Sequence, residues 1–303
     1  MVAMETTLRA RKLAQTPGWN LLALLLLVGC DNNSPAPVVD EASPRPADAG
    51  SLFDPTTAGS VQGRVLWEGK LPGVPLFQAP TSPRTEQRGS ELLNWPNPNV
   101  PRIHPKTRAV EDAVIYLKGV NPKKARPWDL DPAIVEMRDY QFRILQGKHA
   151  KQTGFVRLGD VAEIISRQEV FHAVHANGAA FFSFLYPDPD RTVKRRLNEA
   201  GLIELTSAAG YFWMRSYLFV SDHPYITRTD SQGRFDLAKA PPGEYEVVCW
   251  LPNWREHHHD RDPETCYWTR LYFREPLEIS QKISLANRES KGITFTISEM
   301  QFP

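Results

Sequence analysis

Five of the eight histidines in this chain lie in two short groups that could bind a transition metal. His172 and His175 enclose the sequence HAVH, and His257, His258 and His259 are consecutive. Neutral imidazole nitrogens are ligands of copper and zinc. Side chains three residues apart in a regular strand point to opposite faces, so the first pair reaches one ion only at a bulge or strand end. The alternative is that these histidines are hydrogen-bonded or solvated side chains.

Two of the three cysteines form a candidate disulfide. Cys249 and Cys266 are about 17 residues apart, and such a pair is oxidised in an extracytoplasmic compartment. Two free thiols, or a soft metal-binding pair, are the alternatives. Spacing does not show whether the two Cα atoms come within bonding range.

The third cysteine, Cys30, follows a charged and then an apolar segment. Arg9, Arg11 and Lys12 precede the run LLALLLLVGC, which has the order of a secretory signal. This run resembles the lipobox of bacterial lipoproteins, which implies cleavage before Cys30 and a diacylglyceryl group on its thiol. A transmembrane helix is the alternative, but the apolar run is about half of the roughly 20 residues that span a bilayer. We therefore expect a signal peptide over 1–29 and an exported protein anchored to a bacterial membrane, facing the periplasm or the cell surface.

Composition excludes several function classes. Without residues 1–29, the chain has 33 basic and 34 acidic residues, so no strong positive charge attracts nucleic acid. No phosphate-binding glycine loop, haem-attachment motif or nucleophile elbow is present. We therefore expect neither nucleic-acid binding nor enzyme activity.

Short strands dominate the elements that must position these residues. Residues 30–59 are rich in Pro, Ala, Asp and Ser, which predicts a disordered tether that would reach on the order of 30 Å. Only 190–200 has a helical pattern, and 72–105 is punctuated by proline. Strand-like runs separated by turn residues indicate an all-β sandwich, and they cover residues 61–67, 113–117, 134–137, 141–145, 155–158, 162–166, 179–185, 202–205, 216–220, 244–250, 268–273 and 293–297.

The outer parts of the chain resemble the carboxypeptidase regulatory-like, transthyretin-like (prealbumin-like) sandwich. The matching sequences are GRV, EDAVIYL and TRTDSQGRFDLAKAPPGEYEVV. The resemblance implies a hairpin turn near Gln232 and Gly233 and a core position for Tyr245. Because the matches flank the middle of the chain, the sandwich would comprise 60–124 and 222–303, with a second module inserted at 125–221.

The inserted module resembles a cupredoxin, a Greek-key sandwich that holds type 1 copper. The matching sequences are FVRLGDVAEIIS, VFHAVHANGAAFFSF and GYFWMRSYLFVSDHPYITRTDSQGRF. His172 falls on the first histidine ligand and Met214 on the methionine. Ala208 stands at the cysteine position, or Ser207 if the loop is one residue longer, and Tyr211 stands at the second histidine. The thiolate that copper needs is therefore absent, and we predict a degenerate copper site.

The resemblances imply a binding or assembly module at the cell envelope, with an envelope protein or a glycan as partner and no assigned cofactor. One alternative is a non-blue copper or zinc protein that uses His172, His175 and the run 257–259. A second is a carbohydrate-binding or carbohydrate-active protein, whose exposed aromatic side chains would stack on sugars. The candidates for such stacking are Trp250, Trp254, Tyr267 and Trp268.

Overall fold

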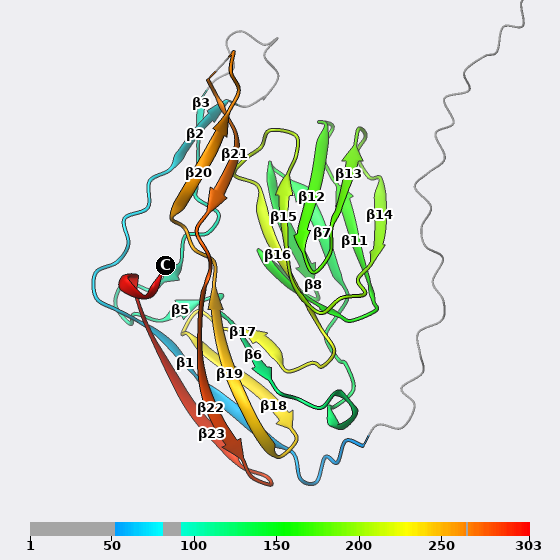
Figure 1. Cartoon of the computed structure of the whole chain (residues 1–303), viewed down its shortest axis with the longest axis vertical. Helices are drawn as coiled ribbons and strands as arrows, with labels where there is room; N and C mark the ends of the chain where they lie inside the picture. The colour runs from blue at the N-terminus through cyan, green and yellow to red at the C-terminus, as the bar shows by residue number, and fades with distance from the viewer. Residues whose placement is uncertain (1–51, 81–91, 265) are drawn as a thin grey trace, which may run out of the picture. The chain divides into compact units, whose positions relative to one another are not determined.

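The computed structural model describes residues 52–80, 92–264 and 266–303 (Figure 1). Cys30, the predicted signal segment and most of the predicted tether lie outside the described residues. Within the described part, regular structure consists of β-strands and two 3-10 turns, η1 Pro122–Lys124 and η2 Glu299–Gln301. The predicted all-β class is therefore confirmed. No helix in this part of the chain has the length and apolar character needed to cross a bilayer.

Two sheets built from the outer parts of the chain share one apolar core. Their orders are β18-β1-β23 and β17-β6-β19-β22. Strand β1 is antiparallel to β18 and parallel to β23, so the first and last long strands of the described chain are neighbours. The bounds are β1 Gly59–Glu68, β18 Arg234–Ala240, β23 Ser290–Ser298, β17 Ile226–Arg228, β6 Val114–Lys118, β19 Gly243–Leu251 and β22 Leu277–Leu285.

Alternating burial explains how β1 joins this core. Val61, Val65 and Trp67 are buried. Gln62, which follows Val61, and Glu68, which follows Trp67, are exposed. Because successive side chains of a strand point to opposite faces, one face of β1 packs inward.

A turn and a core position implied by the regulatory-like resemblance are found, but the expected hairpin is not, because the strands that flank the turn pair with other strands. Gly233 lies in the turn before β18 with φ +70°, and a Cβ there would stand 2.5 Å from the Val65 carbonyl oxygen. Tyr245 is buried, and its hydroxyl donates to the Pro241 carbonyl oxygen at 2.7 Å. Burial raises the pKa of Tyr245 to about 12. The strands on either side of the turn, β17 and β18, belong to different sheets.

The middle of the chain forms two five-stranded sheets around a second core, drawn mainly in green in Figure 1. Their orders are β10-β16-β15-β12-β13 and β14-β11-β7-β8-β9, and each contains one parallel pair, β10 with β16 and β7 with β11. The bounds are β7 Ala133–Arg138, β8 Gln141–Gln146, β9 His149–Lys151, β10 Thr153–Arg157, β11 Val161–Ser166, β12 His172–Gly178, β13 Phe182–Tyr186, β14 Thr192–Arg196, β15 Gly201–Ser207 and β16 Arg215–Ser221.

The predicted helix over 190–200 is wrong. This segment contains the edge strand β14, which is antiparallel to β11. Its buried residues are Val193 and Leu197. A spacing of four places two residues on the same face of either a helix or a strand, so this pattern did not distinguish the two.

Three two-stranded sheets complete the described structure. Strands β2 Phe77–Pro80 and β3 Leu92–Trp95 lie within the proline-punctuated segment, where little regular structure was expected, and β4 Arg102–Ile103 pairs with β5 Val110–Glu111. Strands β20 Glu256–Arg261 and β21 Trp268–Phe273 form the third. The histidine run is therefore in a strand, whereas the sequence suggested a loop.

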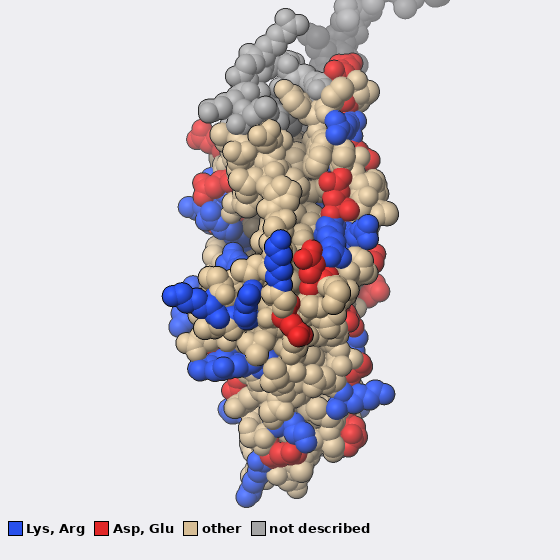
Figure 2. Space-filling view, turned by 90° about the vertical axis from the view of Figure 1, so that its left-hand side faces the viewer, with Lys and Arg blue, Asp and Glu red and all other residues tan. Residues whose placement is uncertain are grey.

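Sheet membership changes between β6 and β7 and again between β16 and β17. The exact module boundaries at 124/125 and 221/222, and the prealbumin-like packing of the outer sheets, stay predictions. On the face drawn in Figure 2, acidic and basic side chains are interspersed.

Candidate functional site

The loop where a cupredoxin would bind copper joins β15 to β16 and folds as a compact turn. The Ala208 amide donates to the Ala173 carbonyl oxygen at 2.8 Å, and the Met214 amide donates to that of Tyr211 at 2.9 Å. Gly210 has φ +86°. Tyr211, Phe212, Trp213 and Met214 are all buried, so this loop belongs to the core of the middle sheets.

His172, at the start of β12, packs against this loop. Its side chain is buried, and its ring lies 5.2 Å from the Tyr211 ring and 6.3 Å from that of Tyr140, centroid to centroid. The imidazole Nε2 lies 3.2 Å from Gln168 Oε1. Burial disfavours the charged imidazolium and lowers the pKa of His172 to about 4. His172 is therefore a neutral imidazole near neutral pH.

Aromatic side chains fill the space around the loop. Trp213 stacks on Trp95 at a centroid distance of 4.5 Å and an interplanar angle of 12°, and its Nε1 donates to the Tyr140 carbonyl oxygen at 2.9 Å. Phe212 contacts Phe77 and Trp268, at 5.7 and 5.4 Å. The β2–β3 and β20–β21 hairpins thus supply aromatic side chains that pack over the loop. These aromatic residues stand on separate short strands, so no regular spacing in the sequence predicts that they pack against the loop.

The residues present do not fit a type 1 copper centre. That centre needs a thiolate and two imidazoles, with a weak thioether contact. Ala208 offers a methyl group at the cysteine position, and Tyr211 offers a ring that is packed among His172, Tyr140 and Trp213. Of the four positions that the resemblance assigns to copper ligands, two carry a side chain of the matching type, His172 and the buried Met214.

The other candidate histidine of β12 lies on the opposite face of the strand, as its spacing predicted. His175 Nδ1 lies 2.9 Å from Ser183 Oγ, and its ring packs edge-on against Phe181 at 5.3 Å. The strand is regular here, since His172 pairs with Tyr186 and His175 with Ser183. No bulge therefore turns His175 toward His172.

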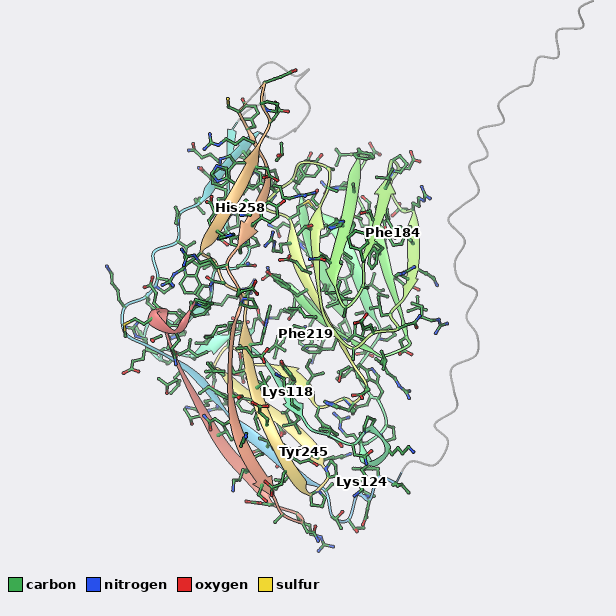
Figure 3. All side chains as sticks on the ribbon, in the orientation of Figure 1. Lys118, Lys124, Phe184, Phe219, Tyr245 and His258 are labelled. Atoms are coloured by element: carbon green, nitrogen blue, oxygen red, sulfur yellow. The ribbon has the colours of Figure 1, made fainter. Side chains whose placement is uncertain are left out.

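The histidine run lies on β20, where Figure 3 labels His258. His258 stacks on Tyr272 at 4.0 Å, and His259 stacks on Trp268 at 4.1 Å. His259 Nδ1 also contacts the Glu256 carboxylate. His257 and His258 have ring centroids 5.0 Å apart. Within the described residues, no group of three or more His, Cys, Asp or Glu side chains has a geometry that could hold a metal ion.

The structure contradicts the expected disulfide between Cys249 and Cys266, because both thiols are free. Cys249 is on β19 and lies in the core of the outer sheets, where burial raises its pKa. Cys266 is exposed, in the connection between β20 and β21. Sequence spacing alone suggested a bond, because it does not distinguish a buried sheet position from an exposed hairpin end.

The aromatic residues considered for sugar stacking do not form one exposed surface. Trp250 and Trp254 are buried in different apolar clusters. Trp268 is partly buried beneath His259, and Tyr267 is the exposed member, at 47%. The core interpretation therefore holds for Trp250 and Trp254.

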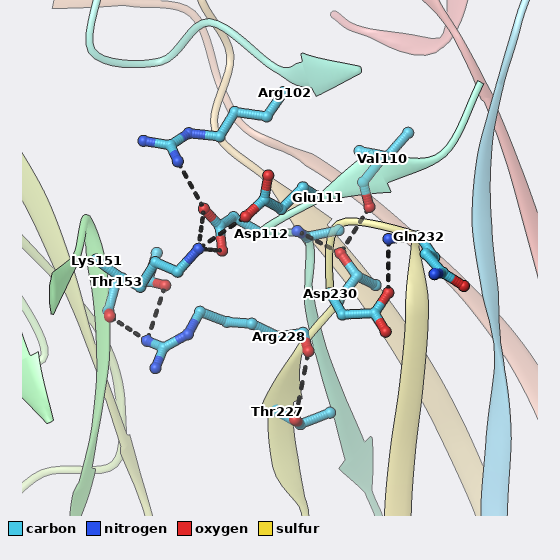
Figure 4. A network of polar contacts seen from close by, with 12 residues as sticks. Arg102, Val110, Glu111, Asp112, Lys151, Thr153, Thr227, Arg228, Asp230 and Gln232 are labelled. Carbon is cyan, nitrogen blue, oxygen red and sulfur yellow. Dashed lines mark hydrogen bonds and ion pairs between the residues drawn. The ribbon is translucent and has the colours of Figure 1, made fainter. Parts of the chain in front are cut away.

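Sequence analysis also missed a polar network that links outer and middle strands (Figure 4). Lys151 Nζ lies 2.9 Å from Glu111 Oε1 and 2.8 Å from Asp112 Oδ1. The Arg228 guanidinium donates to the Thr153 carbonyl oxygen. These residues are ordinary charges at turns and strand ends in the sequence, so no motif marks them.

An apolar cluster accompanies this network. Trp250 of β19 packs against Tyr217 and Phe219 of β16, with ring centroids 5.1 and 5.0 Å away. Figure 3 labels Phe219 at this contact. The outer and middle sheets thus share buried side chains as well as ion pairs.

Comparison with known proteins gives weak similarity to copper proteins. No protein-family model and no curated protein matches the chain. Among solved structures, a Cu(I) amicyanin variant is 18% identical, covering 30% of this chain and 82% of its own, and a reduced amicyanin variant is 14% identical, covering 35% and 99%. Both have a TM-score of 0.24, which is too low to assign a ligand or an activity to this chain.

Proposed function

We propose that this chain is a lipid-anchored binding or assembly module of the bacterial cell envelope, built on a cupredoxin-like scaffold without a type 1 copper site. One observation carries the proposal: residues 211–214 are a packed aromatic core segment, and the resemblance places the exposed Ala208 and the buried Tyr211 at the positions where thiolate and imidazole ligands are needed. A loop of this kind offers no electron-transfer centre. No catalytic group is proposed, and an envelope protein or a glycan is the proposed partner.

Two further features support a structural role for this loop. The His172 Nε2 lies 3.2 Å from Gln168 Oε1 and the ring packs near Tyr140, whereas Nδ1 is buried without a hydrogen-bond partner among the described residues. The β2–β3 and β20–β21 hairpins cover Phe212 and Trp213 with Phe77, Trp268 and Trp95. His172 therefore keeps one possible donor nitrogen, but the packed loop supplies neither the thiolate nor the second imidazole that a type 1 copper centre needs beside it.

The test is metal binding by the full chain purified in detergent. We expect no intense absorption at about 600 nm after addition of copper, because that band comes from a copper–thiolate bond. The double variant Ala208→Cys, Tyr211→His restores both missing ligand types and serves as the matched comparison. His175→Ala, which changes the opposite face of β12, is the control.

Two outcomes contradict the proposal. An intense visible band in the natural chain would show a copper–thiolate centre. Stoichiometric colourless copper or zinc that is lost in His172→Ala or His258→Ala would instead favour the metal-binding alternative.

A further inference from the structure

A cleft of about 450 Å³ lies between the segment 96–102, strands β8 and β9, and the start of β16. This volume is within the range of pockets that hold small organic ligands. Its residues come from both the outer and the middle parts of the chain, so its shape depends on the contact between them. None of them was a candidate site residue from sequence, apart from Met214.

The charged side chains that line this cleft are all basic. They are Arg102, Arg143, Lys151 and Arg215, and no Asp or Glu is among the described residues of the lining. Four cationic side chains around one cavity present several N–H donors to a ligand, and such donors favour an anionic one.

Each of these cations has a carboxylate partner outside the lining: Asp112 for Arg102 and Lys151, Asp139 for Arg143, and Glu204 for Arg215. Glu111 and Asp112, which contact Lys151, line a separate cleft of about 530 Å³ together with Asp129 and Asp131. Lys151 lines both clefts, and Figure 4 shows the Asp112 carboxylate in contact with both Lys151 and Arg102, whose Nη1 lies 3.4 Å from Asp112 Oδ2. The Lys151 network therefore separates a basic cleft from an acidic one.

Arg215 is the most firmly held of the four cations. Its side chain is only 5% exposed, and its Nη1 lies 2.9 Å from Glu204 Oε1. Its Nη2 donates to the Leu271 carbonyl oxygen at 2.6 Å, and the guanidinium lies 4.5 Å from the Phe273 ring centroid. The Nε, in contrast, is buried without a hydrogen-bond partner among the described residues. A buried donor without a partner is costly to a protein, and Arg215 is one of the residues that line the cleft.

The rest of the lining is apolar or uncharged. Val100, Phe142 and Trp213 contribute carbon surface, and Gln141 and Gln152 contribute amides. An inorganic anion would leave the carbon surface without contact, whereas an organic acid would use both kinds of wall. Carboxylates also match the two parallel N–H donors of an arginine.

We propose that this cleft binds a small organic carboxylate, with Arg102, Arg143 and Lys151 at its charged side. The inference rests on the proposed binding role and names its ligand class. The carboxylate could belong to a free acid with an apolar body or to an acidic sugar of a glycan.

Isothermal titration of the full chain in detergent tests this, with benzoate and glucuronate as probes of the two sources. We expect at least one of them to bind, and Arg143→Gln or Arg102→Gln to weaken it about tenfold, since each removes a charge-assisted hydrogen bond. Arg195→Gln is the matched control, because Arg195 is an exposed arginine on β14 outside the cleft and should leave binding unchanged.

The proposal is wrong if neither acid binds, if benzamide or inorganic phosphate binds as tightly as the better acid, or if Arg195→Gln weakens binding as much as Arg143→Gln. Preferential binding of glucuronate would support a glycan source, and preferential binding of benzoate a free acid. The copper experiment tests the loop 208–214, and the titration tests the cleft. A chain that binds neither copper nor a carboxylate would therefore contradict the ligand proposed here and leave the absence of a type 1 copper site supported.

Discussion

The neutral state of His172 makes the stability of the protein depend on pH. The pKa of a histidine in an unfolded chain is about 6.5, whereas the pKa of folded His172 is about 4, because burial disfavours the charged imidazolium. Between these values the unfolded state binds more protons, so the stabilisation is fully present above about pH 6.5 and is lost as the pH falls through about 4. We expect urea unfolding to show this loss, and His172→Phe to reduce it. An unchanged acid dependence in the variant would contradict this assignment.

Trp213 tests the packing role of the loop at the scale of one side chain. Trp213→Ala removes the stack on Trp95 and the hydrogen bond to Tyr140, and it leaves a cavity. We expect a loss of roughly 3–5 kcal/mol in the free energy of unfolding. Phe181→Ala is the control, because Phe181 is 74% exposed and its loss should change stability by about 0.5 kcal/mol or less. Similar losses for both variants would argue against a packed loop.

The positions of single side chains were predicted correctly where they depend only on the geometry of one strand. The opposite faces of His172 and His175 follow from strand alternation alone. The surroundings of Tyr211 and Trp213 depend on Trp95, Phe77 and other residues distant in sequence, which no local pattern could indicate.

Among the elements, strands with a clear run of apolar residues were predictable, including the hairpin strand β21 at 268–273, whereas β14 and β20 were not. Strands β1, β7 and β16 match their predicted ranges closely. Strand β14 carries few apolar residues and looked helical, and β20 carries a histidine run flanked by acidic and basic residues, whose only partner strand in the described structure is β21. Edge strands need only one partner and one buried face, so their sequences are less constrained.

Arg228 of β17 tests the connection between outer and middle elements. Its guanidinium donates to the Thr153 carbonyl oxygen and lies 4.7 Å from the Phe155 ring centroid, and burial lowers its pKa. Arg228→Met keeps most of the side-chain volume but leaves that carbonyl oxygen without this donor, so we expect a loss of about 2 kcal/mol in the free energy of unfolding. The matched control is Arg234→Met on the exposed face of β18. Chemical denaturation of both variants checks this, and equal stability would show that the contact contributes little.

At the scale of the whole molecule, one chain builds outer sheets from its two ends and middle sheets from its centre. The flanking sequence resemblances suggested this order, because they occur on both sides of the cupredoxin-like stretch. They did not indicate the buried side chains and ion pairs that join the two sets of sheets. Those contacts arise between residues far apart in sequence and of ordinary type.

The proposed membrane attachment of the whole molecule depends on a single residue, Cys30. If Cys30 carries a diacylglyceryl group, two acyl chains hold the protein, and each buried CH₂ contributes about 0.8 kcal/mol to anchoring. We expect Cys30→Ser to abolish incorporation of a labelled fatty acid and to move the protein from the membrane fraction to the soluble fraction. Cys266→Ser removes an exposed thiol of the folded part and should leave labelling and fractionation unchanged. Labelling that persists in Cys30→Ser would exclude this anchor, and unlabelled natural protein in the membrane fraction would point to attachment through a partner.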